Sequence, residues 1–88
     1  MERKKARIRG QDLEPIVRIG KKGIDENMVL EIERHLEDKD LIKIKILRNN
    51  PIQDTDEIVD ILEEKTSGKV IETRGRTVLL AAEEELTV

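Results

Sequence analysis

The chain has 88 residues, 42% of them charged, and contains no cysteine and no aromatic residue. This length corresponds to one domain with a modest core, since chains usually divide only beyond about 250 residues. Disulfides, thiolate zinc sites and cysteine nucleophiles are therefore excluded, and the single histidine, His35, leaves little for a catalytic triad or a metal site. We expect a protein that is not an enzyme and that carries no cofactor and no metal.

The net charge of −3 conceals a basic first quarter of the chain. Residues 1–23 contain eight Lys and Arg against three acidic residues, whereas residues 24–88 contain nine against seventeen. Such an asymmetry predicts an anionic partner for one end of the molecule. The abundance of Lys, Glu, Arg and Ile is also typical of hyperthermophile proteins.

Targeting signals are not evident in the sequence. No apolar run approaches the roughly 18 residues of a membrane helix. The charged residues at the N-terminus are not followed by the apolar stretch of a secretory signal. We expect a cytoplasmic protein with no membrane partner and no small-molecule substrate.

The first half of the chain contains three expected elements. Ala6, Gly10 and Leu13 are spaced i, i+4 and i+7, which suits a first helix that packs closely through small side chains. Pro15 leads into a short β-prone run at 16–19. A second helix is expected from the N-cap Asp25 to about residue 38. Its apolar stripe spans about 100° of the helical wheel and contains Met28, Val29, Ile32 and Leu36.

The second half begins with a strand from Leu41 to Leu47, where isoleucines alternate with Lys43 and Lys45. The third helix is expected from Asp54 or Thr55 to Thr66, with Gly68 as its C-terminal cap. Two β-prone runs, 69–73 and 77–81, predict a hairpin that turns at Gly75. An acidic tail at 83–88 follows. The outer face of the third helix is expected to carry Asp56, Asp60, Glu63 and Glu64.

These elements give the order α-β-α-β-α-β-β in one domain, residues 1–82. Two amphipathic helices and a half-buried strand indicate two layers, with helices on one face of a sheet. Strands separated by helices favour parallel pairing, and the final hairpin makes the sheet mixed. The expected class is α/β, of the two-layer α+β kind.

The most specific local feature is the G-x-x-G loop Gly20-Lys21-Lys22-Gly23, which joins a strand to a helix. Glycines let the backbone approach a ligand, the following helix offers free N–H groups, and the lysines add charge, so the loop suits phosphate binding. The alternative is an ordinary strand-to-helix turn with solvated lysines. Asp25 and Glu26 favour that alternative, because they already complement the helix terminus and repel an anion.

The other basic residues have two interpretations. The N-terminal run is either a contact surface for an anionic ligand or a solvated helix face or frayed end, and its closeness in sequence to the loop favours the former. It consists of Arg3, Lys4, Lys5, Arg7 and Arg9, with Arg18 between it and the loop. Lys43 and Lys45 either face RNA or pair with Glu72, and we favour the structural role. Arg74 and Arg76 extend a basic patch only if their turn lies on the loop side.

The run from Leu13 to Ile24, with its Pro15, apolar strand and G-K-K-G loop, and then the strand Leu41-Ile42-Lys43-Ile44-Lys45-Ile46, resembles the CRM domain. CRM stands for chloroplast RNA splicing and ribosome maturation, and the bacterial and archaeal single-domain members are the YhbY-like proteins. The resemblance spans about residues 3–80. It implies a fold similar to the C-terminal domain of translation initiation factor 3.

The resemblance also implies RNA binding through the loop residues Gly20, Lys21, Lys22 and Gly23 and, more loosely, through the basic N-terminal helix. Members of the CRM family associate with precursors of the large ribosomal subunit or act in intron splicing in plant organelles. The chain departs from the family in one place: the last strand ends in Ala81-Ala82-Glu83 where the family often has an aromatic and a basic residue.

Two functions are consistent with the sequence. The first is an RNA-binding protein, directed at ribosomal RNA during large-subunit assembly, which contacts backbone and shape because it has no aromatic ring for stacking. The second is an adaptor that docks a basic protein on the acidic face of the third helix.

Overall fold

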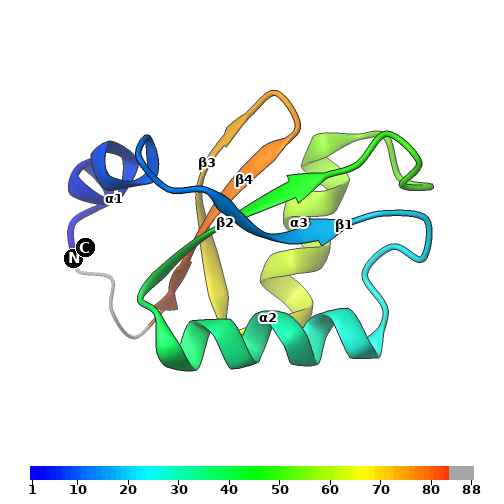
Figure 1. The fold of residues 1–88 in the computed structure, drawn as a ribbon, viewed down its shortest axis with the longest axis horizontal. Coiled ribbons are helices and arrows are strands. Elements are labelled where there is room, and N and C mark those ends of the chain that lie inside the picture. Colours follow the sequence, from blue (N-terminus) through cyan, green and yellow to red (C-terminus); the bar gives the residue numbers. More distant parts are fainter. Residues whose placement is uncertain (84–88) are drawn as a thin grey trace.

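The computed structural model describes residues 1–83, which form three helices and four strands (Figure 1). The order confirms the α-β-α-β-α-β-β prediction, and of the expected acidic tail only Glu83 lies within the described residues. The elements are α1 (Arg3–Gly10), β1 (Pro15–Ile19), α2 (Glu26–Asp38), β2 (Leu41–Ile46), α3 (Thr55–Lys65), β3 (Gly68–Arg74) and β4 (Thr77–Ala82).

The four strands form one mixed sheet in the order β1-β2-β4-β3. β1 and β2 are parallel, whereas β4 is antiparallel to both β2 and β3. The hairpin was expected, and Gly75 makes its turn with φ +58°, a left-handed conformation that glycine adopts without strain. β4, the last strand in the sequence, therefore occupies an inner position between β2 and β3.

The main core lies between the sheet and the helices α2 and α3. The period-two pattern of β2 sends Ile42, Ile44 and Ile46 into this core. Asp25 caps α2 as expected, because its carboxylate accepts a hydrogen bond from the Met28 N–H at 2.8 Å. The stripe of α2 then contributes Ile32 and Leu36, both buried. The two-layer prediction holds for these two helices.

The first helix lies on the opposite face of the sheet. Ala6 of α1 forms a second, smaller cluster with Leu41, Leu79 and Ala81. Gly10 is required for this close packing, since a Cβ there would stand 2.8 Å from the Leu79 Cδ1. The small residues of α1 thus let the helix backbone approach the strands, and α1 covers part of a face that the sequence analysis did not assign to any helix.

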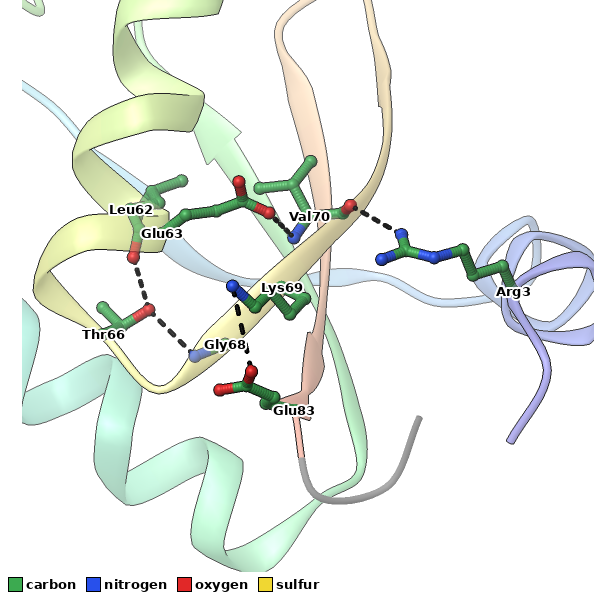
Figure 2. A network of polar contacts seen from close by, with 8 residues as sticks. All are labelled: Arg3, Leu62, Glu63, Thr66, Gly68, Lys69, Val70 and Glu83. Atoms are coloured by element: carbon green, nitrogen blue, oxygen red, sulfur yellow. Dashed lines mark hydrogen bonds and ion pairs between the residues drawn. The ribbon is translucent and has the colours of Figure 1, made fainter. Parts of the chain in front are cut away.

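The expected role of Gly68 as a helix cap is wrong. α3 ends at Lys65, and Thr66 closes it by donating from both its N–H and its hydroxyl to the Leu62 carbonyl, while its hydroxyl oxygen accepts from the Gly68 N–H (Figure 2). Gly68 does not adopt a positive φ. Position 68 requires glycine because a Cβ there would lie only 2.6 Å from the Leu80 Cγ.

Side chains from both faces of the sheet close the outer edge of β3. Glu63 of α3 accepts a hydrogen bond from the Val70 N–H at 2.9 Å, and Arg3 of α1 donates to the Val70 carbonyl at 3.3 Å (Figure 2). A register irregularity between Val70 and Glu72 further interrupts this edge. Unpaired edge strands invite pairing with other chains, and these contacts oppose it. Glu63, expected on a solvated acidic face, is half-buried instead.

Candidate nucleic-acid interface

The G-x-x-G loop is a tight turn with two free cations at its tip. The Gly23 N–H donates to the Gly20 carbonyl at 3.0 Å, and Gly23 has φ +68°, in the left-handed region. Gly20 lies close to the segment after β2, since a Cβ there would stand 3.2 Å from the Asn49 Oδ1. Lys21 and Lys22 are exposed, and neither forms an ion pair or hydrogen bond within residues 1–83. Their charges are therefore available to a ligand.

The start of α2 gives the loop one cationic and one anionic side. A hollow of about 330 Å³ is lined by the loop together with Asp25, Asn27, Met28 and Glu31. The carboxylate of Asp25 already occupies the Met28 N–H, and Glu31 adds a second negative charge on the same wall. A phosphate is thus attracted to the lysine side of the loop and repelled by the helix side.

The basic helix α1 lies at the other end of the sheet from this loop. Its cluster contains Leu41, the first residue of β2, whereas the loop follows Ile19, which pairs with Ile46 at the end of β2. Five residues of extended chain correspond to about 16 Å, and Figure 1 shows α1 and the loop after β1 on opposite sides of the molecule. The two halves of the predicted site are therefore separated, despite their closeness in sequence.

Two of the five basic residues of α1 are held by other parts of the protein. Both terminal nitrogens of Arg9 donate to the Asp40 carboxylate at 2.9 Å, and Arg3 donates to the Val70 carbonyl. Lys4, Lys5 and Arg7 are exposed and make no ion pair or hydrogen bond within the described residues. The charges of these three side chains are therefore available to a ligand.

The Arg9–Asp40 pair gives the protein a pH-dependent contact. The hydrogen bonds from Arg9 hold the pKa of the Asp40 carboxyl below its usual range, and the same bonds raise the pKa of Arg9. Because the carboxyl pKa is lower in the folded state, the pair contributes stability above about pH 4, the pKa of an unfolded aspartate, and this is lost as the pH falls through the lowered value.

Arg9→Gln should lower the free energy of unfolding by about 0.2–1 kcal/mol at pH 7, since both side chains are partly exposed. The difference from the parent should shrink as the pH falls below about 4. Chemical denaturation at pH 7 and pH 2.5 measures both values. Lys4→Gln, on the same helix but unpaired, is the control. A difference that persists unchanged at low pH would mean that Arg9 acts through packing alone.

The part of the sheet face that α1 leaves open is also basic. Arg18 lies between the inward-facing Val17 and Ile19, so its side chain points to this face, as do those of Lys43 and Lys45 between the isoleucines of β2. The turn between β3 and β4 lies at the loop end of the sheet, because the Ile46 N–H donates to the Arg76 carbonyl at 2.7 Å. The condition for Arg74 to extend a basic patch is therefore met.

The pairing that was favoured for the strand lysines does not form. Glu72 contacts Arg74 at 3.6 Å, and neither Lys43 nor Lys45 has an ion pair among residues 1–83. The strand order brings β2 next to β1 and places Lys45 opposite Arg18, a neighbour that the sequence alone does not reveal.

Other candidate sites find no support in the described part of the chain. His35 is half-buried and its side chain has no hydrogen-bond partner there. Within residues 1–83 no three His, Cys, Asp or Glu side chains are arranged to hold a metal ion. None of the helices in that range is long and apolar enough to cross a membrane.

Comparison with known proteins assigns the family. A model of the CRS1 / YhbY (CRM) domain matches residues 1–81. The chain belongs to the CRM domain family. The match extends over α1, the G-x-x-G loop and the whole sheet, so both separated basic elements belong to one CRM domain.

Relatives of this CRM domain occur in bacteria, archaea and plants. It is 31% identical over 77 residues to "Probable RNA-binding protein YqeI" of Bacillus subtilis, covering 88% of this chain and 79% of that protein. It is 31% identical over 75 residues to "Probable RNA-binding protein MJ0652" of Methanocaldococcus jannaschii, covering 84% and 55%. It is 38% identical over 65 residues to "CRS2-associated factor 2, mitochondrial" of rice, covering 74% and 18%.

A solved structure has the same fold. The solution structure of SAV1595 from Staphylococcus aureus aligns with a TM-score of 0.75 and 33% sequence identity. The alignment covers 90% of this chain and 81% of that one. The three helices and mixed four-stranded sheet are thus the fold of this CRM domain and of its structural neighbour.

Proposed function

We propose that this CRM domain binds structured RNA, and that its target is ribosomal RNA during assembly of the large subunit. The observation that carries the proposal is the G-x-x-G loop, whose two lysines are exposed and have no partner among residues 1–83. The names of the bacterial and archaeal relatives, both RNA-binding proteins, support the same chemistry. The ribosomal destination follows from the family resemblance described above.

The mode of binding follows from the side chains available. With no aromatic residue in the chain, bases cannot stack on rings, as they do in many sheet-based RNA modules. Lysine and arginine contacts to phosphates remain, so the protein reads backbone and shape. Affinity then depends strongly on salt, because each neutralised phosphate releases counterions.

The test compares salt dependence in two proteins. The parent should bind labelled ribosomal RNA with a log K that falls linearly with log salt concentration. The variant Lys4→Ala, Lys5→Ala, Arg7→Ala removes the three basic side chains of α1 that have no partner within the described residues. Its slope should be smaller in magnitude by the equivalent of at least two phosphate contacts, each of which contributes about 0.7–0.9 to the slope. Filter binding over a salt series measures both. An unchanged slope would mean that α1 is a solvated helix that makes no phosphate contact. Absence of binding by the parent would reject the proposed function.

Crosslinking in cells, followed by sequencing of the attached RNA, tests the ribosomal target. Recovery of large-subunit RNA supports it, and recovery of other RNAs in its place rejects it while leaving RNA binding intact. The adaptor alternative predicts protein partners that survive nuclease treatment of a pull-down. It has less support, because Glu63 of the acidic face is engaged by Val70 of the sheet.

A further inference from the structure

The register of the sheet aligns four side chains across all four strands. Arg18 of β1 pairs with Lys45 of β2, Lys45 pairs with Thr77 of β4, and Thr77 pairs with Arg74 of β3. Residues paired across neighbouring strands point to the same face. With strands about 4.8 Å apart, this cross-strand row extends over about 14 Å. It lies on the face that α2 and α3 do not cover.

The cations of this row are available to a ligand. Arg18 and Lys45 are exposed and have no ion pair or hydrogen bond within the described residues. The Arg74 side chain is 71% exposed, and its contact with Glu72 at 3.6 Å is loose. Lys43, half-buried, lies behind Lys45 on the same strand and the same face. The strands fix the spacing of the backbone positions from which these side chains extend, so no backbone rearrangement is needed when they bind.

At one end the row adjoins the G-x-x-G loop. The Leu47 N–H donates to the Ile19 carbonyl at 2.8 Å, and the neighbouring Ile46 N–H donates to the Arg76 carbonyl. The end of β2 is therefore fixed between the residue before the loop and the turn after Arg74.

At the other end the row adjoins α1. A small cavity of about 40 Å³ lies between the end of this helix and the row. It is lined by Gly10, Gln11, Lys43, Glu72, Arg74, Thr77 and Leu79. Lys43 and the row thus occupy the gap between the two basic elements that the sequence singled out.

We propose that the cross-strand row is a binding surface for RNA phosphates, which carries the RNA backbone over the open sheet face from the loop towards α1. This inference rests on the proposed function and adds a third contact surface to it. An acidic protein segment could also meet these charges. RNA fits better, because protein interfaces have an apolar centre, and α1 already covers Leu41, Leu79 and Ala81 on this face.

The first experiment uses the unmodified protein. Titration of 15N-labelled protein with an RNA stem-loop carrying single-stranded flanks should shift the amide resonances of Arg18, Lys45, Arg74 and Thr77 together with those of the loop. The amides on the outer sides of α2 and α3 should stay in place. Shifts confined to the loop and α1 would overturn the proposal and leave RNA binding itself intact.

The second experiment removes charge from the row. Arg18→Gln with Lys45→Gln should weaken binding of the same RNA about tenfold at physiological salt and lower the salt slope by about 1.4, or two single-strand contacts. The matched control is Arg34→Gln with Lys65→Gln, two exposed, unpaired cations on α2 and α3. Unchanged thermal midpoints verify folding.

If the variant of the cross-strand row and the control variant bind RNA with equal affinity, the proposal is overturned. An acidic protein segment would then be the favoured partner of this face. A parent that binds no RNA would instead reject the proposed function, and this inference with it. The two failures are therefore distinguished by the parent protein alone.

Discussion

Reversing both charges of the loop, Lys21→Glu with Lys22→Glu, should reduce RNA affinity about 100-fold at physiological salt. The loss of two phosphate contacts accounts for about tenfold of this reduction, as for Arg18→Gln with Lys45→Gln. Repulsion between the new carboxylates and the RNA adds to this loss. Filter binding at fixed salt measures it.

The protein should remain folded in this experiment. Both lysines are exposed and have no partner in the described part of the chain, and such surface substitutions usually change the free energy of unfolding by less than about 0.5 kcal/mol. Arg34→Glu with Lys65→Glu makes the same change in net charge on the helical side of the molecule. It should lose far less affinity, since only long-range attraction is altered. If the loop variant stays within twofold of the parent, the loop does not bind phosphate.

Gly68→Ala should destabilise the protein by about 2 kcal/mol, although it adds one methyl group. The new Cβ would collide with the side chain of Leu80, which is fully buried in the main core. Overpacking of this kind costs about 1–3 kcal/mol. Chemical denaturation of the variant and the parent gives the difference.

A double-mutant cycle separates this collision from a backbone effect. Leu80→Ala alone should cost about 3 kcal/mol by leaving a cavity. In that background Gly68→Ala should cost almost nothing, since the atoms that it meets are gone, which gives a coupling energy of about 2 kcal/mol. Gly75→Ala is the matched control: it has open space but φ +58°, so its cost of about 1 kcal/mol should be the same in both backgrounds. Absence of coupling would mean that Leu80 does not exclude a side chain at position 68.

The fold could be predicted from local patterns because most of its determinants are local. The cap at Asp25 depends on a residue three positions away, and the buried face of β2 follows from strict alternation. Gly68 was misinterpreted because the reason for glycine there is Leu80, twelve residues along the chain and on a neighbouring strand. Such a contact leaves no periodic signal in the sequence.

The sequence suggests candidate site residues, but it does not show on which surface they lie. The separation of α1 from the loop arises because β1 is extended and carries the chain from one end of the sheet to the other. The engagement of Arg9 by Asp40 also depends on tertiary placement, since the two residues are 31 positions apart in the sequence. Charge counts alone assign such an arginine to the ligand, whereas the structure assigns it to the fold.

The inner position of β4 has a consequence for the order in which the protein can form. β2 pairs with β1 on one side, but its link to β3 runs entirely through β4, the last strand of the chain. Ala6 of α1 packs against Leu79 and Ala81 of this same strand, which follow it by more than seventy residues in the sequence. While the chain is being synthesised, the basic helix therefore lacks its partners Leu79 and Ala81 until β4 has emerged. Closure of such a distant contact is slow compared with local helix formation. The basic face is therefore complete only after β4 has paired with both β2 and β3.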